Sequence, residues 1–399
     1  MDPGHAPWLN PGHYPGSQPA ERNVDISADV IILGGGIAGA SAAFFLAPHA
    51  SVVLLEAEEQ FGQHSSGRSA AQFTVGITAP AMRRLAAASR AFLAQPPAGF
   101  AASPLLHRRG SLTFGRAGDE ARLDALARRI REAGAQAKRL DMAGTLARFP
   151  LLLAASAAAG AVEEPDAMEI EVDALLQGYL RGARAHGARC LGAQRVLGLH
   201  HEAQGWEVRT QAAAFRAPRI VNAAGAWVDE VAALAGVRPI GIQPYRRTAF
   251  TFAPTPGLDH TIWPHVADIG GRWYVQPDAG QMMGSLADAT PCLPCDAMPE
   301  EFDIALAIDR IGADTRLQIG RPIHRWAGLR SFVRDRDPVA GKATDAPGFF
   351  WLAGQGGCGV LTSPALGEAA AALVLGHAWP EALRAAGLVP ASLAPSRLA

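Results

Sequence analysis

The sequence predicts an α/β fold that begins with a βαβ unit of the Rossmann type. The apolar run DVIIL at 29–33 ends in three glycines, and the segment 38–47 that follows is rich in Ala, Phe and Leu. A second apolar and β-branched run, SVVLL at 51–55, completes the unit. This order is typical of a strand, a tight turn, a helix and a buried parallel strand.

The first turn carries the strongest local motif of the chain, GGGIAG at 34–39. Gly34 permits the tight turn, Gly36 lets the backbone approach a pyrophosphate, and Gly39 lets the helix pack closely on the strand. The N-terminus of the helix presents free N–H groups and a partial positive charge to phosphates. Glu56 ends the second strand, where a carboxylate can accept hydrogen bonds from ribose hydroxyls. The alternative is a plain glycine turn with a solvated glutamate.

Two later segments favour FAD over NAD as the dinucleotide. HSSGRS at 64–69 offers hydroxyls and Arg68, which could hold the pyrophosphate from its other side. GQGGCG at 354–359 precedes a segment that is compatible with a helix. A turn of this kind can bring backbone N–H groups to the pyrimidine side of a flavin, where negative charge develops on reduction. A solvated polar loop and a plain glycine-rich turn are the respective alternatives.

Composition limits the class of protein and its partners. The chain has 399 residues, 49% hydrophobic and 18% charged, as expected for a globular protein with more than one lobe. Lys and Arg number 36 against 37 Asp and Glu, without a long basic run, so we expect no nucleic-acid partner. The uncharged window at 348–367 is broken by glycines and Pro364, so we expect a cofactor loop and helix and no transmembrane segment.

The N-terminus and the cysteines bear on the compartment. Residues 1–27 are rich in Pro, Gly and His and lack the features of a signal peptide, which predicts a flexible extension. Four cysteines, Cys190, Cys292, Cys295 and Cys358, are too few for a disulfide framework and fit a reducing cytoplasm. No second pair follows the CxxC at 292–295 at metal-ligand spacing, so we expect free thiols and no metal site.

The remaining segments indicate that the dinucleotide domain is interrupted. Apolar residues from 172 to 183 recur at helical spacing before Gly187, and the segment 192–224 reads as a hairpin that returns to the sheet as RIVNAA. We expect an N-terminal extension at 1–27, an FAD-binding domain at 28–77, 161–242 and 326–399, and a substrate-binding domain at 78–160 and 243–325.

Blocks of sequence from residue 28 onward carry a resemblance to a known family. They include GGGIAGASAAFFL, HSSGRSAA, LLQGYLRG, VNAAGAW, WAGLRSF and GFFWLAGQGG. In order and spacing they resemble the D-amino-acid oxidase superfamily of flavoproteins, and within it the D-arginine dehydrogenase-like enzymes. The resemblance implies a Rossmann-type FAD-binding domain with an interleaved α+β substrate-binding domain, and FAD held non-covalently. It also implies that hydride passes from Cα to flavin N5 and that the imine hydrolyses to a 2-oxo acid and ammonia.

The resemblance implies the site residues as well. Arg330 falls on an arginine that makes a two-pronged pair with the substrate carboxylate, Tyr274 on a tyrosine whose hydroxyl touches it, and Arg247 on a second arginine there. A guanidinium matches a carboxylate in geometry and stays charged at any working pH. The residues expected to bind the cofactor are Gly34, Gly36, Ile37, Ala38, Gly39, Glu56, Ser66, Arg68, Ser69, Ala70, Val196, Gly225, Gly354, Gly356, Gly357, Gly359 and Val360.

Three positions depart from the D-arginine enzymes. Gln72 stands where they carry a histidine of a proton relay, and Ile77 replaces a carboxylate-binding tyrosine of the lid. The glutamate that receives the guanidinium of D-arginine aligns with Ser111, or by a shift of one residue with Gly110. A neutral or hydrophobic side chain, or a secondary amine, therefore suits this site better. Loss of this histidine does not rule out oxidation of the amine, because a desolvated amine can deprotonate without a protein base.

The sequence thus predicts FAD-dependent oxidative deamination of a D-amino acid, with Arg330, Arg247, Tyr274 and Gln72 at the site of reaction. A quinone or oxygen would accept the electrons, and a glycine or sarcosine oxidase-like enzyme is the closest alternative. A flavin-binding subunit with little activity of its own is a second class. We expect a cytoplasmic protein that could attach at the membrane periphery through its electron acceptor.

Overall fold

A twisted sheet, which we call the Rossmann sheet, forms the centre of one half of the protein. The computed structural model describes residues 25–398, and within them this sheet has the order β10-β3-β2-β14-β22-β21. All neighbouring strands are parallel except β21, which runs antiparallel to β22. The strands are β2 (Val30–Leu33), β3 (Val52–Leu55), β10 (Arg189–Leu191), β14 (Arg219–Asn222), β21 (Val339–Lys342) and β22 (Phe349–Ala353).

The strands of the Rossmann sheet are apolar throughout because both of its faces are covered. In β2, Val30 and Ile32 face α1 (Ile37–Leu46), α5 (Val172–Ala185) and α8 (Gly359–Leu375). Ile31 and Leu33 face the opposite side and pack on a smaller sheet and α6 (Val228–Leu234). That smaller sheet has the order β1-β13-β12-β11, with bounds β1 (Asp25–Ser27), β11 (Val196–Glu202), β12 (Gly205–Thr210) and β13 (Ala214–Ala217).

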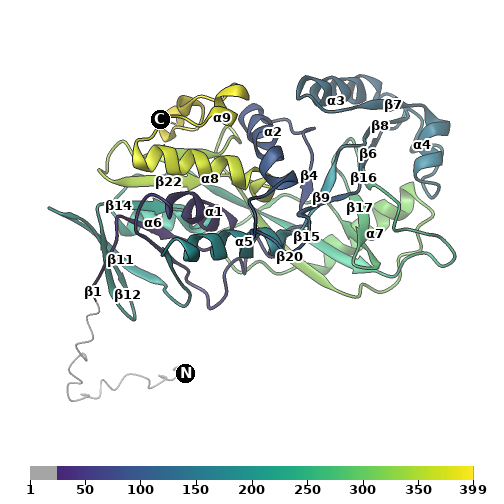
Figure 1. Cartoon of the computed structure of the whole chain (residues 1–399). Helices are drawn as coiled ribbons and strands as arrows, with labels where there is room; N and C mark the ends of the chain where they lie inside the picture. The colour runs from purple at the N-terminus through teal and green to yellow at the C-terminus, as the bar shows by residue number, and fades with distance from the viewer. Residues whose placement is uncertain (1–24, 399) are drawn as a thin grey trace, which may run out of the picture.

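The other half of the protein is built on a second sheet, the large sheet (Figure 1). Its order is β19-β15-β18-β17-β16-β6-β8-β7, and β20 pairs with β15. One face packs on α7 (Glu301–Asp314) through residues such as Phe250, Val266 and Val275. The strands are β6 (Ser111–Phe114), β7 (Lys138–Leu140), β8 (Ala161–Glu164), β15 (Gln243–Phe252), β16 (His265–Asp268), β17 (Tyr274–Asp278), β18 (Gln281–Ser285), β19 (Thr290–Pro291) and β20 (Arg325–Phe332).

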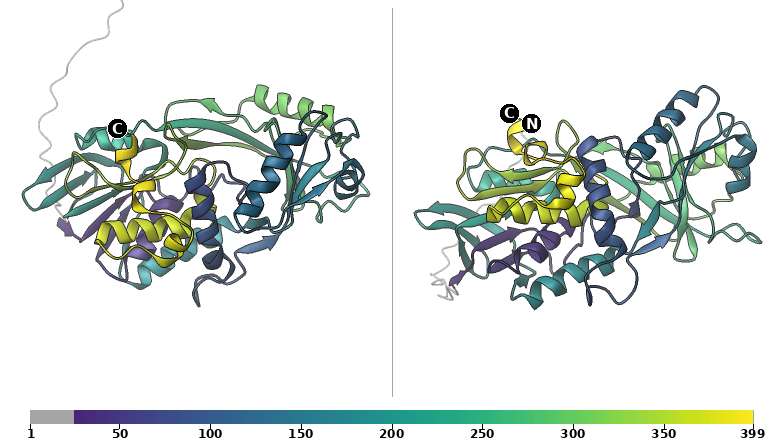
Figure 2. Two further views of the ribbon diagram at one scale, coloured as in Figure 1. Left: turned by 90° about the horizontal axis from the view of Figure 1, so that it is seen from above. Right: turned by 45° about the horizontal axis from the view of Figure 1, so that its top comes forward.

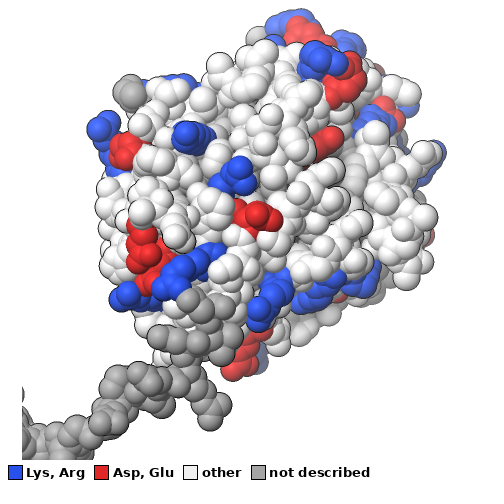
Figure 3. Space-filling view, turned by 60° about the vertical axis from the view of Figure 1, so that its left-hand side comes forward, with Lys and Arg blue, Asp and Glu red and all other residues white. Residues whose placement is uncertain are grey.

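The two halves lie side by side, and the chain crosses between them several times (Figures 1 and 2). Three short strands pair in the order β4-β9-β5 and form a separate small sheet. On the face drawn in Figure 3, acidic and basic side chains are interspersed on a largely uncharged surface. The remaining elements are β4 (Gln72–Phe73), β5 (Leu106–Arg108), β9 (Met168–Ile170), α2 (Pro80–Ala94), α3 (Glu120–Glu132), α4 (Met142–Arg148) and α9 (Glu381–Ala385).

The predicted βαβ unit, the helix at 172–183 and the hairpin at 192–224 are confirmed. The expected domain limits differ from the packing of three elements. Strands β8 and β20 belong to the large sheet although they fall in segments assigned to the FAD-binding domain, because they pair with β6 and β15. Helix α2, assigned to the substrate-binding domain, packs on α8. The division into two domains remains a prediction.

Of the N-terminal extension expected at 1–27, residues 1–24 lie outside the described residues, and residues 25–27 form β1. Residues 25–27 therefore do not form a flexible extension, because β1 pairs in parallel with β13. Among the helices of residues 25–398, none is both long and apolar enough to cross a membrane.

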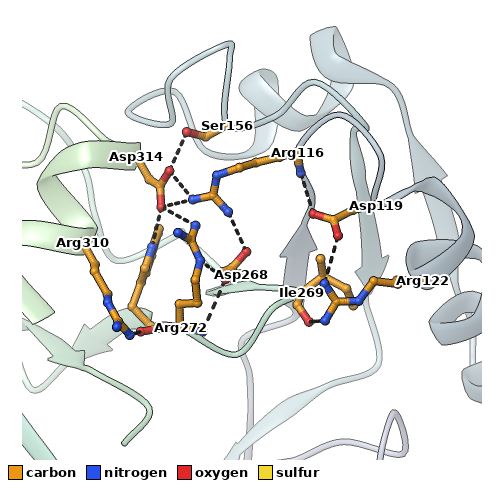
Figure 4. Close-up of polar contacts among 10 residues, drawn as sticks. Arg116, Asp119, Arg122, Ser156, Asp268, Ile269, Arg272, Arg310 and Asp314 are labelled. Carbon is orange, nitrogen blue, oxygen red and sulfur yellow. Dashed lines mark hydrogen bonds and ion pairs between the residues drawn. The ribbon is translucent and has the colours of Figure 1, made fainter.

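A network of ion pairs holds the large sheet to the C-terminal end of α7 (Figure 4). Arg116 bridges Asp314 and Asp268, whose side chains are 5% and 1% exposed, so the bridge joins two buried carboxylates. Although burial opposes its ionisation, these contacts hold the pKa of Asp314 below the usual value. The donors to the Asp314 carboxylate are Arg116, Arg272, the hydroxyl of Ser156 and the indole nitrogen of Trp273.

Asp314→Asn is expected to lower the free energy of unfolding by about 1.5–3 kcal/mol, because hydrogen bonds to charged groups contribute on this scale. Urea unfolding followed by circular dichroism measures the change. Asp124→Asn is the matched control, since Asp124 is half exposed and makes a surface pair with Arg139. Its effect should stay within about 0.5 kcal/mol. Equal losses in the two variants would contradict the importance of the buried network.

Candidate active site

A cavity of about 860 Å³ is lined by residues of both halves of the protein. Its size lies in the range that proteins use for small molecules and cofactors. The Rossmann half contributes the glycine turn after β2, the end of β3 and the loop at 62–72. The large sheet contributes residues of β15, β16, β17 and β20, and the turn at 355–358 with the first residues of α8 completes the lining.

The glycine turn brings the backbone to the cavity for steric reasons. Gly34 has φ +105°, and a Cβ there would lie 2.5 Å from the carbonyl oxygen of Ala223, which directly follows the neighbouring strand β14. A Cβ on Gly39 would lie 1.9 Å from the carbonyl oxygen of Gly34, so only glycine lets α1 approach the turn. The N-terminus of α1 lines the cavity, and the backbone N–H of Ile37 donates to Oγ of Ser66 at 2.9 Å.

Glu56 lies where the second strand ends, as predicted, and lines the cavity. Its Oε2 accepts from the backbone N–H of Gly35 at 2.6 Å, and its Oε1 accepts from that of Glu58 at 3.0 Å. These two bonds orient the carboxylate. Since each carboxylate oxygen can accept a second bond, the predicted contact with ribose hydroxyls stays available.

The side-chain contacts of Arg68 differ from the expected contact with the pyrophosphate. Its guanidinium donates to the carbonyl oxygens of Ala297 and Ala327 at 2.9 and 3.1 Å and pairs with Asp296. These acceptors direct the side chain to the large sheet, so we assign Arg68 to joining the loop at 62–72 to β20 rather than to the pyrophosphate. A contact of this residue with the cofactor would involve its backbone.

The second glycine turn supports the same cavity from the C-terminal side. Gly356 has φ +53°, and a Cβ there would lie 2.1 Å from the ring of Phe332. Gln355 lines the cavity, and its Nε2 is buried without a hydrogen-bond partner among the described residues. Burial raises the pKa of the Cys358 thiol to about 11, so it stays protonated and unreactive at neutral pH.

These features fit a flavin dinucleotide. The N-termini of α1 and α8 both meet the cavity and offer backbone donors to negative groups. The unpartnered Nε2 of Gln355 is a further donor next to the glycine turn, where a flavin ring would present carbonyl oxygens. A protonated Cys358 thiol is consistent with a cofactor that is held without a covalent bond.

One face of the large sheet carries the residues expected to hold a carboxylate. Side chains alternate between the faces of a strand, and residues opposite each other in the ladder share a face. Tyr245 pairs with Arg330 and Arg247 with Gly328, so Arg247 and Arg330 are diagonal neighbours on one face of β15 and β20. Tyr274 lines the same cavity from β17.

This end of the cavity carries two guanidiniums against one carboxylate, that of Asp288, whose Oδ1 lies 3.9 Å from Nε of Arg247, so its net charge is positive. Burial and the neighbouring Arg330 lower the pKa of Arg247 to about 10, which leaves it protonated at neutral pH. Nε of Arg247 donates to the backbone oxygen of Asp288. Among residues 25–398, no ion pair or side-chain hydrogen bond includes the guanidinium of Arg330. A Cβ on Gly357 would lie 3.1 Å from Nη1 of Arg330, so this glycine makes room for the guanidinium.

The structure brings most of the predicted site residues together. Arg330, Arg247, Tyr274 and Gln72 all line the cavity, and Nε2 of Gln72 lies 3.5 Å from the carbonyl oxygen of Gly110. Gly39 and Gly354 are not in the lining and act through the packing and the turn beside it. The predicted cofactor residues in the lining are Gly34, Gly36, Ile37, Ala38, Glu56, Ser66, Arg68, Ser69, Ala70, Val196, Gly225, Gly356, Gly357, Gly359 and Val360.

Sequence reasoning missed several residues of the site, and three of them lie near the predicted carboxylate site. His265 lines the cavity from β16, with its ring centroid 5.2 Å from that of Tyr274. Asp288 accepts from Arg247, and Trp326 lines the cavity from β20. Alternation along β15 and β20 could have indicated Trp326, two residues before Gly328. No local signal marks the other two, since strands far apart in the chain position them.

Comparison with known proteins identifies relatives over most of the chain. The family DAO, described as FAD dependent oxidoreductase, matches residues 29–373. Glycine oxidase of Geobacillus kaustophilus is 26% identical over 363 residues, which cover 87% of this chain and 92% of that protein. The hydrogen cyanide synthase subunit HcnC of Pseudomonas aeruginosa is 26% identical over 214 residues, 53% of this chain and 50% of that protein.

Solved structures show the same fold at lower identity. L-proline dehydrogenase from P. horikoshii superposes with a TM-score of 0.81 at 21% identity, covering 94% of this chain and 98% of that one. L-amino acid deaminase from Proteus myxofaciens, in complex with anthranilate, has a TM-score of 0.78 at 17% identity and covers 96% of each chain. Both contain the arrangement of layers described above.

Proposed function

The chain belongs to the DAO family of FAD-dependent oxidoreductases, and from this premise we propose that it oxidises the C–N bond of a D-amino acid. FAD is its cofactor. We further propose that FAD is held without a covalent bond and that the substrate carries a neutral or hydrophobic side chain. A quinone or oxygen would take the electrons, in a cytoplasmic setting.

One observation carries the proposal. Arg330 and Arg247 lie side by side at one end of the cavity, and the guanidinium of Arg330 has no anionic partner among the described residues. Two adjacent cations in a partly buried site repel each other until an anion binds between them. A carboxylate satisfies the planar donors of arginine in a two-pronged arrangement. The site therefore suits a small molecule that is recognised by its carboxylate.

The residues of the chain orient the substrate rather than react with it. Arg330, Arg247 and Tyr274 would fix the carboxylate and so the position of Cα. Burial lowers the pKa of His265 to about 4, so its ring is neutral and does not repel the substrate ammonium group. Desolvation in the cavity favours the uncharged amine that oxidation requires. When bound, FAD supplies the hydride acceptor.

Similarity to glycine oxidase over 92% of that protein favours a second candidate, an oxidase of glycine or of a secondary amine that uses oxygen. Both candidates share the carboxylate site and differ in the substituents on nitrogen and Cα. A flavin-binding subunit with little activity is less well supported, because it would have no use for the unpaired Arg330.

Anaerobic mixing of the FAD-loaded protein with D- and L-amino acids, glycine and sarcosine tests the proposal. We expect particular D-amino acids to bleach the visible flavin band, because reduced flavin loses that absorbance. Admission of air afterwards separates an oxidase, whose colour returns rapidly, from a dehydrogenase. Bleaching by glycine and sarcosine alone would favour the second candidate, and bleaching by L-amino acids alone would refute the D configuration.

A further inference from the structure

A second cavity, of about 210 Å³, adjoins the carboxylate end of the first. Three residues, Gln72, Thr74 and His265, line both cavities and form their common boundary. Its walls are largely apolar, with Leu126, Ile130, Val162 and Ile77 among them. Gly76 and the polar residues Ser111, Thr113 and Glu164 complete the lining.

Three polar side chains form a row along one end of this second cavity. Glu164 on β8 pairs with Ser111 on β6, and Ser111 pairs with His265 on β16. Paired residues on neighbouring strands share a face, and their Cβ atoms are about 5 Å apart. All three line the second cavity, so one row of the large sheet carries a carboxyl, a hydroxyl and an imidazole toward the same space.

The two outer members of the row have unused hydrogen-bonding capacity. Glu164 accepts from Oγ1 of Thr74 at 2.6 Å and from the backbone N–H of Val75 at 2.9 Å. A carboxyl group has about four acceptor positions, so about two remain. No ion pair among residues 25–398 includes Glu164, which is 4% exposed. Nδ1 of His265 is buried and has no hydrogen-bond partner among the same residues.

The position of the second cavity relates it to the substrate. The ring of His265 lies 5.2 Å from the ring of Tyr274, one of the three residues expected to hold the carboxylate. A carboxylate at Arg330 and Arg247 leaves Cα close to this boundary, from which a side chain can enter the second cavity. Resting on the proposed function, we propose that the second cavity holds the substrate side chain and that Glu164 and His265 select a hydroxyl group on it.

A hydroxyl suits the row better than a cation or a purely apolar group. Burial raises the pKa of Glu164, which disfavours the charged form that would attract an ammonium group. A hydroxyl can donate its one proton to one member of the row and accept a hydrogen bond from the other. An apolar side chain would leave Nδ1 of His265 without a hydrogen-bond partner next to it, and buried groups without partners are destabilising.

Two pairs of ligands test the inference on the wild-type, FAD-loaded protein. D-threonine and D-valine have the same shape and differ by a hydroxyl in place of a methyl. We expect kcat/KM, or the anaerobic rate of flavin bleaching, to favour D-threonine at least about tenfold. 3-Hydroxybutyrate and 3-methylbutyrate are the corresponding acids without the amino group, so calorimetry gives their Kd in the absence of reaction. The same preference is expected there.

Variants of Glu164 locate the source of that preference. Glu164→Leu should weaken 3-hydroxybutyrate binding about tenfold and leave 3-methylbutyrate nearly unchanged, because only the hydroxyl loses a partner. Glu164→Gln keeps a polar group of the same shape and should restore most of the preference. Glu163 is the matched control, since this neighbouring carboxylate pairs with Arg148 and lines neither cavity. Glu163→Gln should leave the ratio of the two Kd values unchanged.

The outcomes separate this inference from the proposed function. Equal Kd values for the two acids in the wild-type protein overturn the inference, even where D-valine bleaches the flavin and supports the proposed function. Tighter binding of 3-hydroxybutyrate without bleaching by any amino acid supports the hydroxyl site and overturns the proposed function. The wild-type comparison needs no variant, so a variant that fails to fold leaves the test intact.

Discussion

Replacing Arg330 with alanine is expected to lower kcat/KM for the amino-acid substrate by a factor of about 10²–10⁴, mainly by raising KM, while FAD stays bound. The guanidinium of Arg330 has no anionic partner among the described residues and lies beside Arg247 in the cavity. Removal of one partner of a desolvated, hydrogen-bonded charge pair typically costs 2–5 kcal/mol or more. Steady-state kinetics with an artificial electron acceptor measure the effect.

Two controls separate the role of the guanidinium from damage to the strand. Arg330→Lys keeps the charge but loses the planar pair of donors, so it should recover only part of the lost kcat/KM. Arg325→Ala alters the same strand at an exposed residue that pairs with Glu301 on the surface. It should keep the kinetics of the wild-type protein. Unchanged kinetics in Arg330→Ala, with FAD retained, would refute the carboxylate-binding role.

Gly39→Ala is expected to abolish stable FAD binding. The added Cβ would lie 1.9 Å from the carbonyl oxygen of Gly34, and the contact is with backbone, so the turn and α1 must separate. That movement would displace the backbone of Gly36 and Ile37, which line the cavity at the start of the helix. We expect the purified variant to lack yellow colour and its melting temperature to rise far less than that of the wild type when FAD is added.

Gly312→Ala is the matched control for that experiment. Gly312 lies in α7, and a Cβ there would meet no atom within 4 Å. Alanine at an open helical position should stabilise the protein by up to about 1 kcal/mol without loss of FAD. A Gly39→Ala protein that keeps its FAD would show that α1 can move away without disturbing the phosphate turn.

The predictable parts of the fold are those that depend on residues close together in the sequence. The run DVIIL, the glycines at 34–36 and the run SVVLL specify a strand, a turn and a strand within 27 residues, and the structure confirms each. Gly39 was interpreted correctly because its steric role depends on a turn only five residues away. Periodicity alone identified α5, since its apolar stripe faces a single layer.

The rest depended on pairing between distant strands. Glu164, Ser111 and His265 are neighbours only because β8, β6 and β16 lie side by side in that order. The sequence carries no local signal for that register, and the same is true of β20, which joins β15 across the expected domain limit. The side-chain contacts of Arg68 could not be predicted for a related reason, since its acceptors come from residues 296, 297 and 327.

The pairing of β15 with β20 has a stereochemical consequence. Backbone hydrogen bonds of the ladder fix the separation of Arg247 and Arg330, and β16 fixes His265 on the same sheet. A ligand held by its carboxylate and by its side chain at two rigid points can place its α-hydrogen on one side of Cα only. Mirror-image ligands would present opposite substituents to the flavin. Changes that loosen the hold of the second cavity on the side chain should therefore weaken the enantiomer preference as well as alter which side chains are accepted.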